Sequence, residues 1–282
     1  MFNIQVYNSI AKSGLSKFDS KKFNIGTEVV EPQAYLMRSH KLHGQPISSS
    51  LLALARAGAG VNNIPVEEYT EKGIVVFNTP GANANAVKEL IVASLLIGSR
   101  DIIGGIEYAN GLIGINDFAE MNRLLEKEKK RFAGEEIFGK TLGIVGLGAI
   151  GSMVANLGSS LGMKVIGYDP AISVETAWQL SSKVKRMDSL ETLLSQSDFV
   201  TLHVPAIPST KDLINSKNLR KMKPSAKLLN FARAEIVNLN DLIDAIENKV
   251  IGGYISDFPM PGMIGLKNVL LMPHIGASTK EA

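Results

Sequence analysis

The sequence predicts an α/β protein with two doubly wound parallel sheets, and two observations carry that prediction. Short apolar runs alternate with helical patterns along the chain, which is typical of parallel strands joined by helices that cover both faces of a sheet. A glycine-rich motif, Gly146-Leu147-Gly148-Ala149-Ile150-Gly151, stands in the middle of the chain and not at its start. A complete α/β region therefore precedes the motif, and we expect that region to form a domain of its own.

The predicted strands are short apolar runs. They are residues 4–7, 34–38, 52–57, 74–78, 142–145, 165–169, 199–204, 227–231, 253–257 and 269–272. A helix is predicted from about Asn83 to Arg100, and its nearly all-round apolar surface indicates burial between domains. Residues 104–139 are polar and interrupted by glycine, as in an arm or linker. We expect one domain at 1–95, to which 276–282 returns, and a second at 96–275.

The glycine motif predicts a dinucleotide site because it joins a predicted strand to a predicted helix. Gly146 permits a tight turn, Gly148 lets the backbone approach a pyrophosphate, and Gly151 lets the helix pack close to the strand. The amides at the start of that helix, including those of Ala149 and Ile150, would face the phosphates. The next strand ends at Asp169, where a dinucleotide fold carries its ribose-binding acid. A loop acid before Pro170 is the alternative explanation of Asp169.

Composition excludes several other classes of protein. Of the 282 residues 45% are hydrophobic, and the net charge is only +3, so neither nucleic acid nor a membrane surface is an expected partner. There is no cysteine, which excludes disulfides and thiolate metal sites and is consistent with a cytoplasmic protein. No His/Asp/Glu cluster has metal-ligand spacing, so no metal is expected. The N-terminus lacks the apolar core of a signal peptide, and no apolar run is long enough to span a bilayer.

Candidate catalytic residues follow the predicted strands, since ligands of open α/β sheets bind beyond the carboxyl ends of strands. Arg233 follows strand 227–231, where a guanidinium can hold a carboxylate in bidentate fashion, although a surface arginine gives the same pattern. His274 follows strand 269–272 and is the preferred proton-transfer group among the four histidines. His203 ends another strand, and is either structural or part of the cofactor site.

The first domain offers two possible anion contacts. Arg38 and Ser39 end a predicted strand, where a phosphate or a carboxylate can bind. The small residues from Ala57 to Val61, which include Ala59 and Gly60, can expose backbone amides to an anion. An ordinary glycine-rich turn explains this second stretch equally well.

Taken together, these motifs resemble the D-isomer-specific 2-hydroxyacid dehydrogenases, and they follow the family order over nearly the whole chain. The matching segments are residues 56–63, 76–81, the glycine motif with Asp169, 202–205, 230–233 and 273–279. The resemblance implies a flavodoxin-like substrate domain and a Rossmann domain that binds NAD. It further implies a homodimer that oxidises a D-2-hydroxy acid, with 3-phospho-D-glycerate as the expected substrate. The alternatives are a reductase of glyoxylate, hydroxypyruvate or another small 2-keto acid, and an NAD-responsive binding protein with weakened catalysis.

The resemblance also implies a role for individual residues. Arg233 would anchor the substrate carboxylate and His274 would be the acid–base. The other implied substrate contacts are Arg38 and Ser39 for a phosphate, and the backbone of Ala59 and Gly60 for the carboxylate. The implied cofactor contacts outside the glycine motif are Asp169, His203, Val204, Pro205, Ala232 and Asp257, the last near the nicotinamide.

Two departures from the family pattern concern the acid–base residue and its surroundings. Family members usually carry a glutamate shortly after Asp257, and it pairs with the histidine, but residues 258–263 contain no carboxylate. His274 therefore lacks the charge that would orient it. The usual Arg-Gly is Arg233-Ala234 here, which is a milder change.

Overall fold

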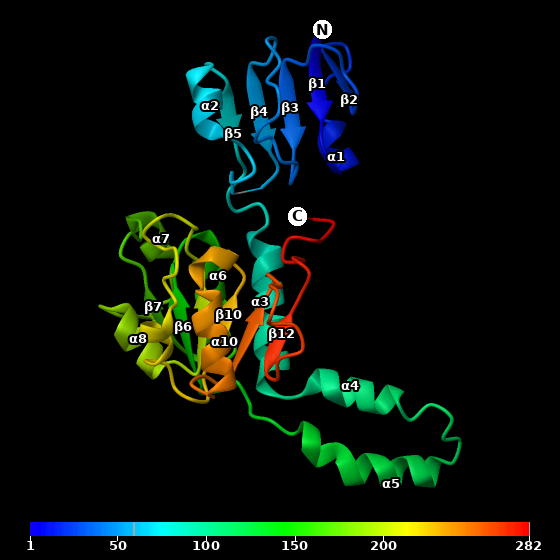
Figure 1. The fold of residues 1–282 in the computed structure, drawn as a ribbon, viewed down its shortest axis with the longest axis vertical. Helices are drawn as coiled ribbons and strands as arrows, with labels where there is room; N and C mark the ends of the chain where they lie inside the picture. The colour runs from blue at the N-terminus through cyan, green and yellow to red at the C-terminus, as the bar shows by residue number, and fades with distance from the viewer. Residues whose placement is uncertain (59, 282) are drawn as a thin grey trace. The chain divides into compact units, whose positions relative to one another are not determined.

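The computed structural model describes residues 1–58 and 60–281, which divide into two compact units (Figure 1). The first unit comprises residues 1–83 and 279–281, and the second comprises residues 84–278. The sequence places the boundary near residue 95. In the structure, helix α3 (Ala84–Ser99) packs against α6 (Ala149–Ser160) and two strands of the second sheet, and therefore belongs to the second unit.

The first unit is built on a five-stranded parallel sheet within the described residues. Its strands are β1 (Phe2–Val6), β2 (Phe23–Gly26), β3 (Ala34–Met37), β4 (Ala53–Arg56) and β5 (Val75–Phe77), accompanied by helices α1 (Lys12–Leu15) and α2 (Val66–Glu71). The strand order is β2-β1-β3-β4-β5, so the direction of winding reverses between β1 and β3. That reversal marks the place where a doubly wound sheet opens a crevice for ligands. The buried side chains of Tyr35, Met37, Leu54 and Tyr69 form the core of this unit.

The second unit contains a seven-stranded parallel sheet in the part of the chain that is described. Its strands are β6 (Thr141–Val145), β7 (Lys164–Tyr168), β8 (Lys185–Arg186), β9 (Phe199–Leu202), β10 (Lys227–Asn230), β11 (Gly253–Ser256) and β12 (Val269–Leu271). The order β12-β11-β10-β9-β6-β7-β8 reverses between β6 and β9. The two sheets confirm the predicted fold class.

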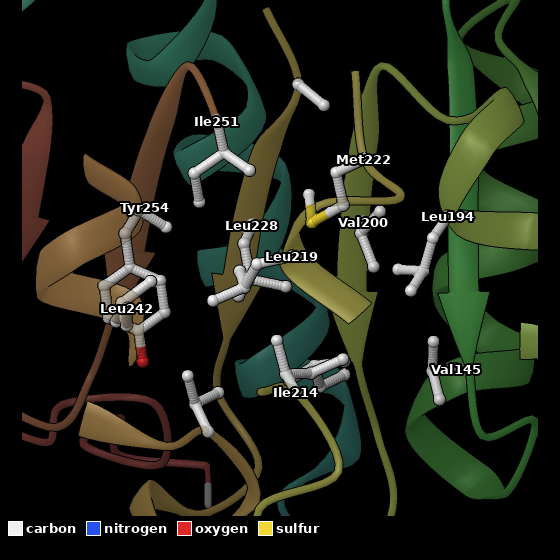
Figure 2. Packing of buried hydrophobic residues seen from close by; sticks show 14 of the residues in the cluster. Val145, Leu194, Val200, Ile214, Leu219, Met222, Leu228, Leu242, Ile251 and Tyr254 are labelled. Carbon is white, nitrogen blue, oxygen red and sulfur yellow. The ribbon is translucent and has the colours of Figure 1, made fainter. Parts of the chain in front are cut away.

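Helices cover both faces of the second sheet. The helices after β6 are α6, α7 (Val174–Gln179), α8 (Leu190–Gln196), α9 (Ser216–Leu219), η2 (Ala234–Ile236) and α10 (Leu239–Glu247). Figure 2 shows one face, where side chains such as Leu228 and Val200 of the sheet pack with Leu219 and Leu242 of the helices. On the other face, α3 lies so close that a Cβ on Gly98 would stand 2.6 Å from the Ile255 side chain. Burial on both faces explains why the central strands read as continuous apolar runs.

Three helices lie within residues 102–132, which overlap the arm or linker predicted at 104–139. They comprise α4 (Ile102–Asn110), α5 (Phe118–Glu128) and η1 (Lys129–Phe132), and α4 and α5 extend away from the second sheet (Figure 1). The side chains of Asp101 and Asp117 cap the two α-helices by accepting hydrogen bonds from the amides of Gly104 and Ala119, each at 2.9 Å. None of the residues described in these three helices is buried.

The sequence also missed the edge strands β2 and β8. Strand β8 contains two exposed basic residues, and none of the four residues of β2 is fully buried, so neither presents an apolar pattern. Among the helices of the described residues, none has the length and apolarity needed to cross a membrane.

Candidate active site

The glycine motif forms the turn between β6 and α6, and its backbone requires glycine at two positions. Gly146 has a positive φ of 92°, and a Cβ there would lie 2.7 Å from the carbonyl oxygen of His203. A Cβ on Gly151 would lie 2.0 Å from the carbonyl oxygen of Gly146. At Gly148, by contrast, no described atom lies within 4 Å of where a Cβ would stand. This open space beside the N-terminus of α6 fits a phosphate group.

Asp169 follows β7 and lies beside this turn. Its Oδ2 accepts a hydrogen bond from the amide of Leu147 at 2.7 Å, and its Oδ1 accepts one from the amide of Ala171 at 2.9 Å. Each carboxylate oxygen can accept more than one hydrogen bond, so both retain capacity for ribose hydroxyls. The same side chain therefore supports the turn and fits the ribose-binding position.

His203 follows β9 and closes the other side of the turn. Its amide donates to the carbonyl of Val145 at 2.7 Å, and its Nε2 lies 3.0 Å from the hydroxyl of Thr201. Burial lowers the pKa of His203 to about 3, so its imidazole is neutral at physiological pH. The structure therefore favours a positioning role over proton transfer. Val204 adjoins the same turn, and Pro205 is exposed beyond it.

Arg233 lies in the loop after β10, and this loop is organised by the buried side chain of Asn230. The Nδ2 of Asn230 donates to the carbonyl of Arg233 at 2.8 Å, and its Oδ1 accepts from the amide of Ala232 at 3.2 Å. The half-buried guanidinium donates one hydrogen bond to the carbonyl of Ala232 at 2.6 Å. In the described residues no carboxylate pairs with it, so its charge is available to an anionic ligand.

His274 follows β12 and is exposed at the same edge of the sheet. Its backbone has a positive φ of 57°, which is uncommon for a residue with a side chain and is often found at functional positions. The ring packs edge-to-face on Phe258, with 5.0 Å between centroids. Among the described carboxylates none is hydrogen-bonded to this imidazole, in keeping with the missing glutamate.

Asp257 follows β11 and is only 2% exposed. Its Oδ1 accepts from the amide of Ile275 at 2.7 Å, and its Oδ2 accepts from the amide of Gly276 at 2.6 Å. The resemblance places this residue near the nicotinamide. In the structure, both of its oxygens hold the turn that follows His274. These bonds also keep residues 276–278 in the second unit, although the sequence assigned them to the first.

The candidate residues of the second unit thus meet at one edge of one sheet. Strands β6, β7, β9, β10, β11 and β12 are parallel, and the glycine motif, Asp169, His203, Arg233, Asp257 and His274 each follow the carboxyl end of one of them. The reversal of strand order between β6 and β9 lies within this group. That is where an α/β sheet of this kind binds a nucleotide.

In the first unit, Arg38 and Ser39 follow β3 at the reversal of strand order. The Oδ1 of Asn8, at the end of β1, accepts from the amides of Ser39 at 3.0 Å and His40 at 2.7 Å. The carbonyl of Arg38 accepts from the Nε of Arg56 at 2.9 Å and the Nδ2 of Asn63 at 3.2 Å. Asn8, Arg56 and Asn63 had no predicted role, and the reversal of strand order between β1 and β3 is the signal that points to this place in the first unit.

The remaining first-unit candidates lie after β4. Gly60 is half-buried in that loop, and Ala59 lies outside the described residues. The preceding amide, that of Gly58, donates to the hydroxyl of Thr79 at 2.7 Å, which ties this loop to the end of β5. Among the residues that the structure describes, no three His, Asp or Glu side chains gather as ligands of a metal ion.

Comparison with known proteins places these observations in a family. Residues 108–276 match the model of the D-isomer specific 2-hydroxyacid dehydrogenase, NAD binding domain. The chain is 38% identical to the D-3-phosphoglycerate dehydrogenase of Synechocystis, in an alignment 290 residues long that covers 99% of this chain and 48% of that protein. It is also 38% identical to the hydroxypyruvate reductase of Thermotoga maritima over 242 residues, 83% of this chain and 73% of that protein.

The fold agrees with the family assignment. The crystal structure of the TT0316 protein from Thermus thermophilus superimposes with a TM-score of 0.81 at 25% identity, covering 99% of this chain and 91% of that one. The chain spans about half the length of the Synechocystis relative, at 48%. The family match, the open turn at Gly148 and the placement of Asp169 agree on the cofactor. The chain therefore belongs to the D-isomer specific 2-hydroxyacid dehydrogenase family, and residues 108–276 are its NAD-binding domain.

Proposed function

We propose that this protein is a cytoplasmic, NAD-dependent dehydrogenase of a D-2-hydroxy acid. One observation carries the proposal: Arg233, without a carboxylate partner in the described residues, and the exposed His274 follow strands of the same sheet whose edge holds the glycine turn. A protein that only binds NAD needs the glycine turn alone. A dehydrogenase also needs a cation to hold the substrate and a group to move a proton.

The chain's own residues divide the work as follows. The pyrophosphate of NAD would be held by the turn of Gly146, Gly148 and Gly151 and by the amides of Ala149 and Ile150. When bound, NAD supplies the hydride acceptor. The remaining cofactor contacts are Asp169 for the ribose, and His203, Val204, Pro205, Ala232 and Asp257 along the carboxyl ends of the strands. Arg233 holds the substrate carboxylate through two parallel hydrogen bonds, and His274 takes the proton of the hydroxyl group as the carbonyl forms.

The substrate we propose is 3-phospho-D-glycerate, whose oxidation to 3-phosphohydroxypyruvate is the first step of L-serine biosynthesis. Support comes from the Synechocystis relative, which is a D-3-phosphoglycerate dehydrogenase, and from the Arg38-Ser39 loop, whose Arg38 carbonyl accepts a hydrogen bond from Arg56. Gly60 and its neighbour Ala59 would contact the substrate carboxylate through their backbone. A reductase of hydroxypyruvate, glyoxylate or a similar 2-keto acid is the second candidate, favoured by the Thermotoga relative.

Turnover of matched substrates tests the proposal. We expect the protein to oxidise NADH with 3-phosphohydroxypyruvate at a higher kcat/KM than with hydroxypyruvate or glyoxylate. The decrease in NADH absorbance at a fixed enzyme concentration measures the rate with each substrate. A higher kcat/KM for the unphosphorylated acids would support the reductase. Binding of NADH without turnover of any 2-keto acid would contradict the dehydrogenase and favour an NAD-responsive binding protein.

Phosphate recognition is expected to depend on Arg38. Arg38→Ala removes a charged hydrogen-bond donor, worth about 1.5–3 kcal/mol. The kcat/KM for the phosphorylated substrate should therefore fall by about 10-fold or more, while that for hydroxypyruvate stays near the wild-type value. Steady-state kinetics with both substrates measure the difference. Equal losses on both would mean that Arg38 supports the fold or contacts a group common to both substrates.

The cofactor preference is expected to depend on Asp169. Its carboxylate accepts hydrogen bonds from ribose hydroxyls and repels a 2′-phosphate, so NADH should bind at least about 10-fold more tightly than NADPH. Fluorescence titration with both dinucleotides measures the two dissociation constants. Asp169→Asn keeps the shape of the side chain without its negative charge, and should therefore narrow the difference between the dissociation constants of NADH and NADPH. Tighter binding of NADPH by the wild type would overturn the assignment.

We also propose a homodimer, formed through the helices of residues 102–132. Ile106 and Phe118 are 56% and 74% exposed in the single chain, which is unfavourable for large apolar side chains unless a second copy covers them. Light scattering at micromolar concentration should give twice the chain mass, and the double variant Ile106→Glu/Phe118→Glu should give a monomer. Val30→Glu, at a residue 83% exposed outside these helices, is the control and should remain dimeric. A wild-type monomer would contradict the proposal.

A further inference from the structure

We propose that Asp257 and Phe258 are positioning residues for His274: they fix its backbone and its ring, and so replace the orienting carboxylate that this chain lacks. The inference rests on the proposed dehydrogenase function, in which His274 moves the substrate proton. The contacts that carry it are present in the folded chain itself, and can be tested with or without turnover.

Asp257 fixes the backbone on the C-terminal side of His274. Its two oxygens accept from the consecutive amides of Ile275 and Gly276 at 2.7 Å and 2.6 Å, and the carboxylate is buried. Hydrogen bonds from amides to a carboxylate are among the stronger ones in proteins. The turn is also tight, since a Cβ on Gly276 would lie 3.0 Å from Oδ2 of Asp257. The carboxylate therefore holds the chain in the turn that leaves His274 with a φ of 57°.

Phe258 fixes the ring itself. The phenyl and imidazole rings meet edge-to-face, with centroids 5.0 Å apart and planes at 68°. This geometry is favoured electrostatically between aromatic rings, and it constrains the rotation of the imidazole on one side. A carboxylate hydrogen-bonded to the imidazole would constrain the same rotation of the ring by holding one of its nitrogens. The ring contact leaves both imidazole nitrogens without a described hydrogen-bond partner.

A buried polar network holds Phe258 in register with the Arg233 loop. The hydroxyl of Ser256 accepts from the amide of Phe258 at 3.1 Å and donates to the carbonyl of Asn230 at 2.9 Å. The side chain of Asn230 in turn binds the backbone of the Arg233 loop. Both Ser256 and Asn230 are fully buried. Arg233, which would hold the substrate carboxylate, is therefore connected to His274 through strands β10 and β11. Asp257 and Phe258 make the final contacts to His274 in this network.

The first test replaces Asp257 with asparagine, which preserves the shape of the side chain but can accept from only one of the two amides. Hydrogen exchange at Ile275 and Gly276 should accelerate by about 10-fold or more. If the protein is a dehydrogenase, kcat should fall by about 10- to 100-fold, because misplacement of a reacting group by about 1 Å has this effect. The KM for the 2-keto acid should stay unchanged. Asp188→Asn is the control, since it removes the same charge from an exposed side chain.

The second test replaces Phe258 with leucine, which removes the ring and leaves the Asp257 contacts in place. The chain has four histidines, so the imidazole proton resonances are few, and His274→Gln identifies that of His274. In Phe258→Leu this resonance should shift as the ring current is lost, and kcat should fall with KM unchanged. Phe258→Tyr keeps the ring and should restore both the resonance and kcat.

The outcomes separate this proposal from the proposed function. A wild type that binds NADH but reduces no 2-keto acid would refute the dehydrogenase, while amide exchange and the imidazole resonance would still decide whether Asp257 and Phe258 position His274. Unchanged exchange in Asp257→Asn, or an unchanged His274 resonance in Phe258→Leu, would overturn the inference. A loss of NADH affinity with normal kcat in Asp257→Asn would also overturn it, because the carboxylate would then serve the cofactor and not His274.

Discussion

Replacing His274 with glutamine is expected to lower kcat by about 10²–10⁴-fold, the usual contribution of a positioned acid–base group. Glutamine keeps hydrogen-bonding capacity but cannot exchange a proton in the physiological range. The Kd of NADH should change little, since the glycine turn and Asp169 follow other strands of the sheet, β6 and β7. Steady-state kinetics and fluorescence titration of the same preparation measure the two quantities.

His43→Gln is the matched control for this change. His43 lies in a loop of the first unit, where its Nε2 is 3.0 Å from the carbonyl of Asn62, and the substitution should leave kcat unchanged. His203 cannot take over proton transfer in His274→Gln, because burial lowers the pKa of His203 to about 3. Normal turnover of His274→Gln would show that another group moves the proton.

Replacing Arg233 with alanine is expected to raise the KM for the 2-keto acid by about 10- to 100-fold, which corresponds to the loss of about 1.5–3 kcal/mol from a charged hydrogen-bonded contact. The loop should keep its conformation, because Asn230 binds its backbone and not the guanidinium. Arg233→Lys keeps the charge but loses the planar fork that matches a carboxylate, so its KM should be intermediate.

Arg220→Ala is the control for Arg233, since Arg220 is an exposed arginine at the end of α9 in the same unit. Its KM should equal that of the wild type, and the Kd of NADH should be the same in all three variants. Initial rates over a range of 2-keto acid concentrations measure the effect. A wild-type KM in Arg233→Ala would place the substrate carboxylate elsewhere.

Much of the fold was predictable because it depends on local patterns. Strands buried on both faces must be apolar throughout, so β6, β9, β10 and β11 are visible as short apolar runs. Strands β2 and β8 were missed because β8 consists of two exposed basic residues and no residue of β2 is fully buried, so neither forms an apolar run. The helices α4 and α5 were missed because glycines at 104, 105, 111 and 114 interrupt the apolar pattern, although α5 itself has distinct apolar and polar faces.

The glycine turn and the strand-end positions of Arg233 and His274 were also predictable. The positive φ of Gly146 and the close approach of Gly151 to the carbonyl of Gly146 both lie within one strand-turn-helix segment. The contacts that support the candidate residues were not predictable. The carboxylate of Asp257 meets the amides of Ile275 and Gly276, and Asn8 meets the amides of Ser39 and His40. Each contact joins segments that lie far apart in the chain.

By itself, therefore, the sequence determined the fold class, the cofactor turn and the identity of the candidate chemical groups, because periodicity and the conformation of a strand-turn-helix segment depend largely on neighbouring residues. Only the tertiary structure decided which side chains orient those groups. A hydrogen bond between two loops depends on strand order and register, and these are set by packing of the whole sheet. The contacts of His274 show the difference: its position after a strand could be read from the sequence, whereas its partners Asp257 and Phe258 become evident only when β11 and β12 lie side by side.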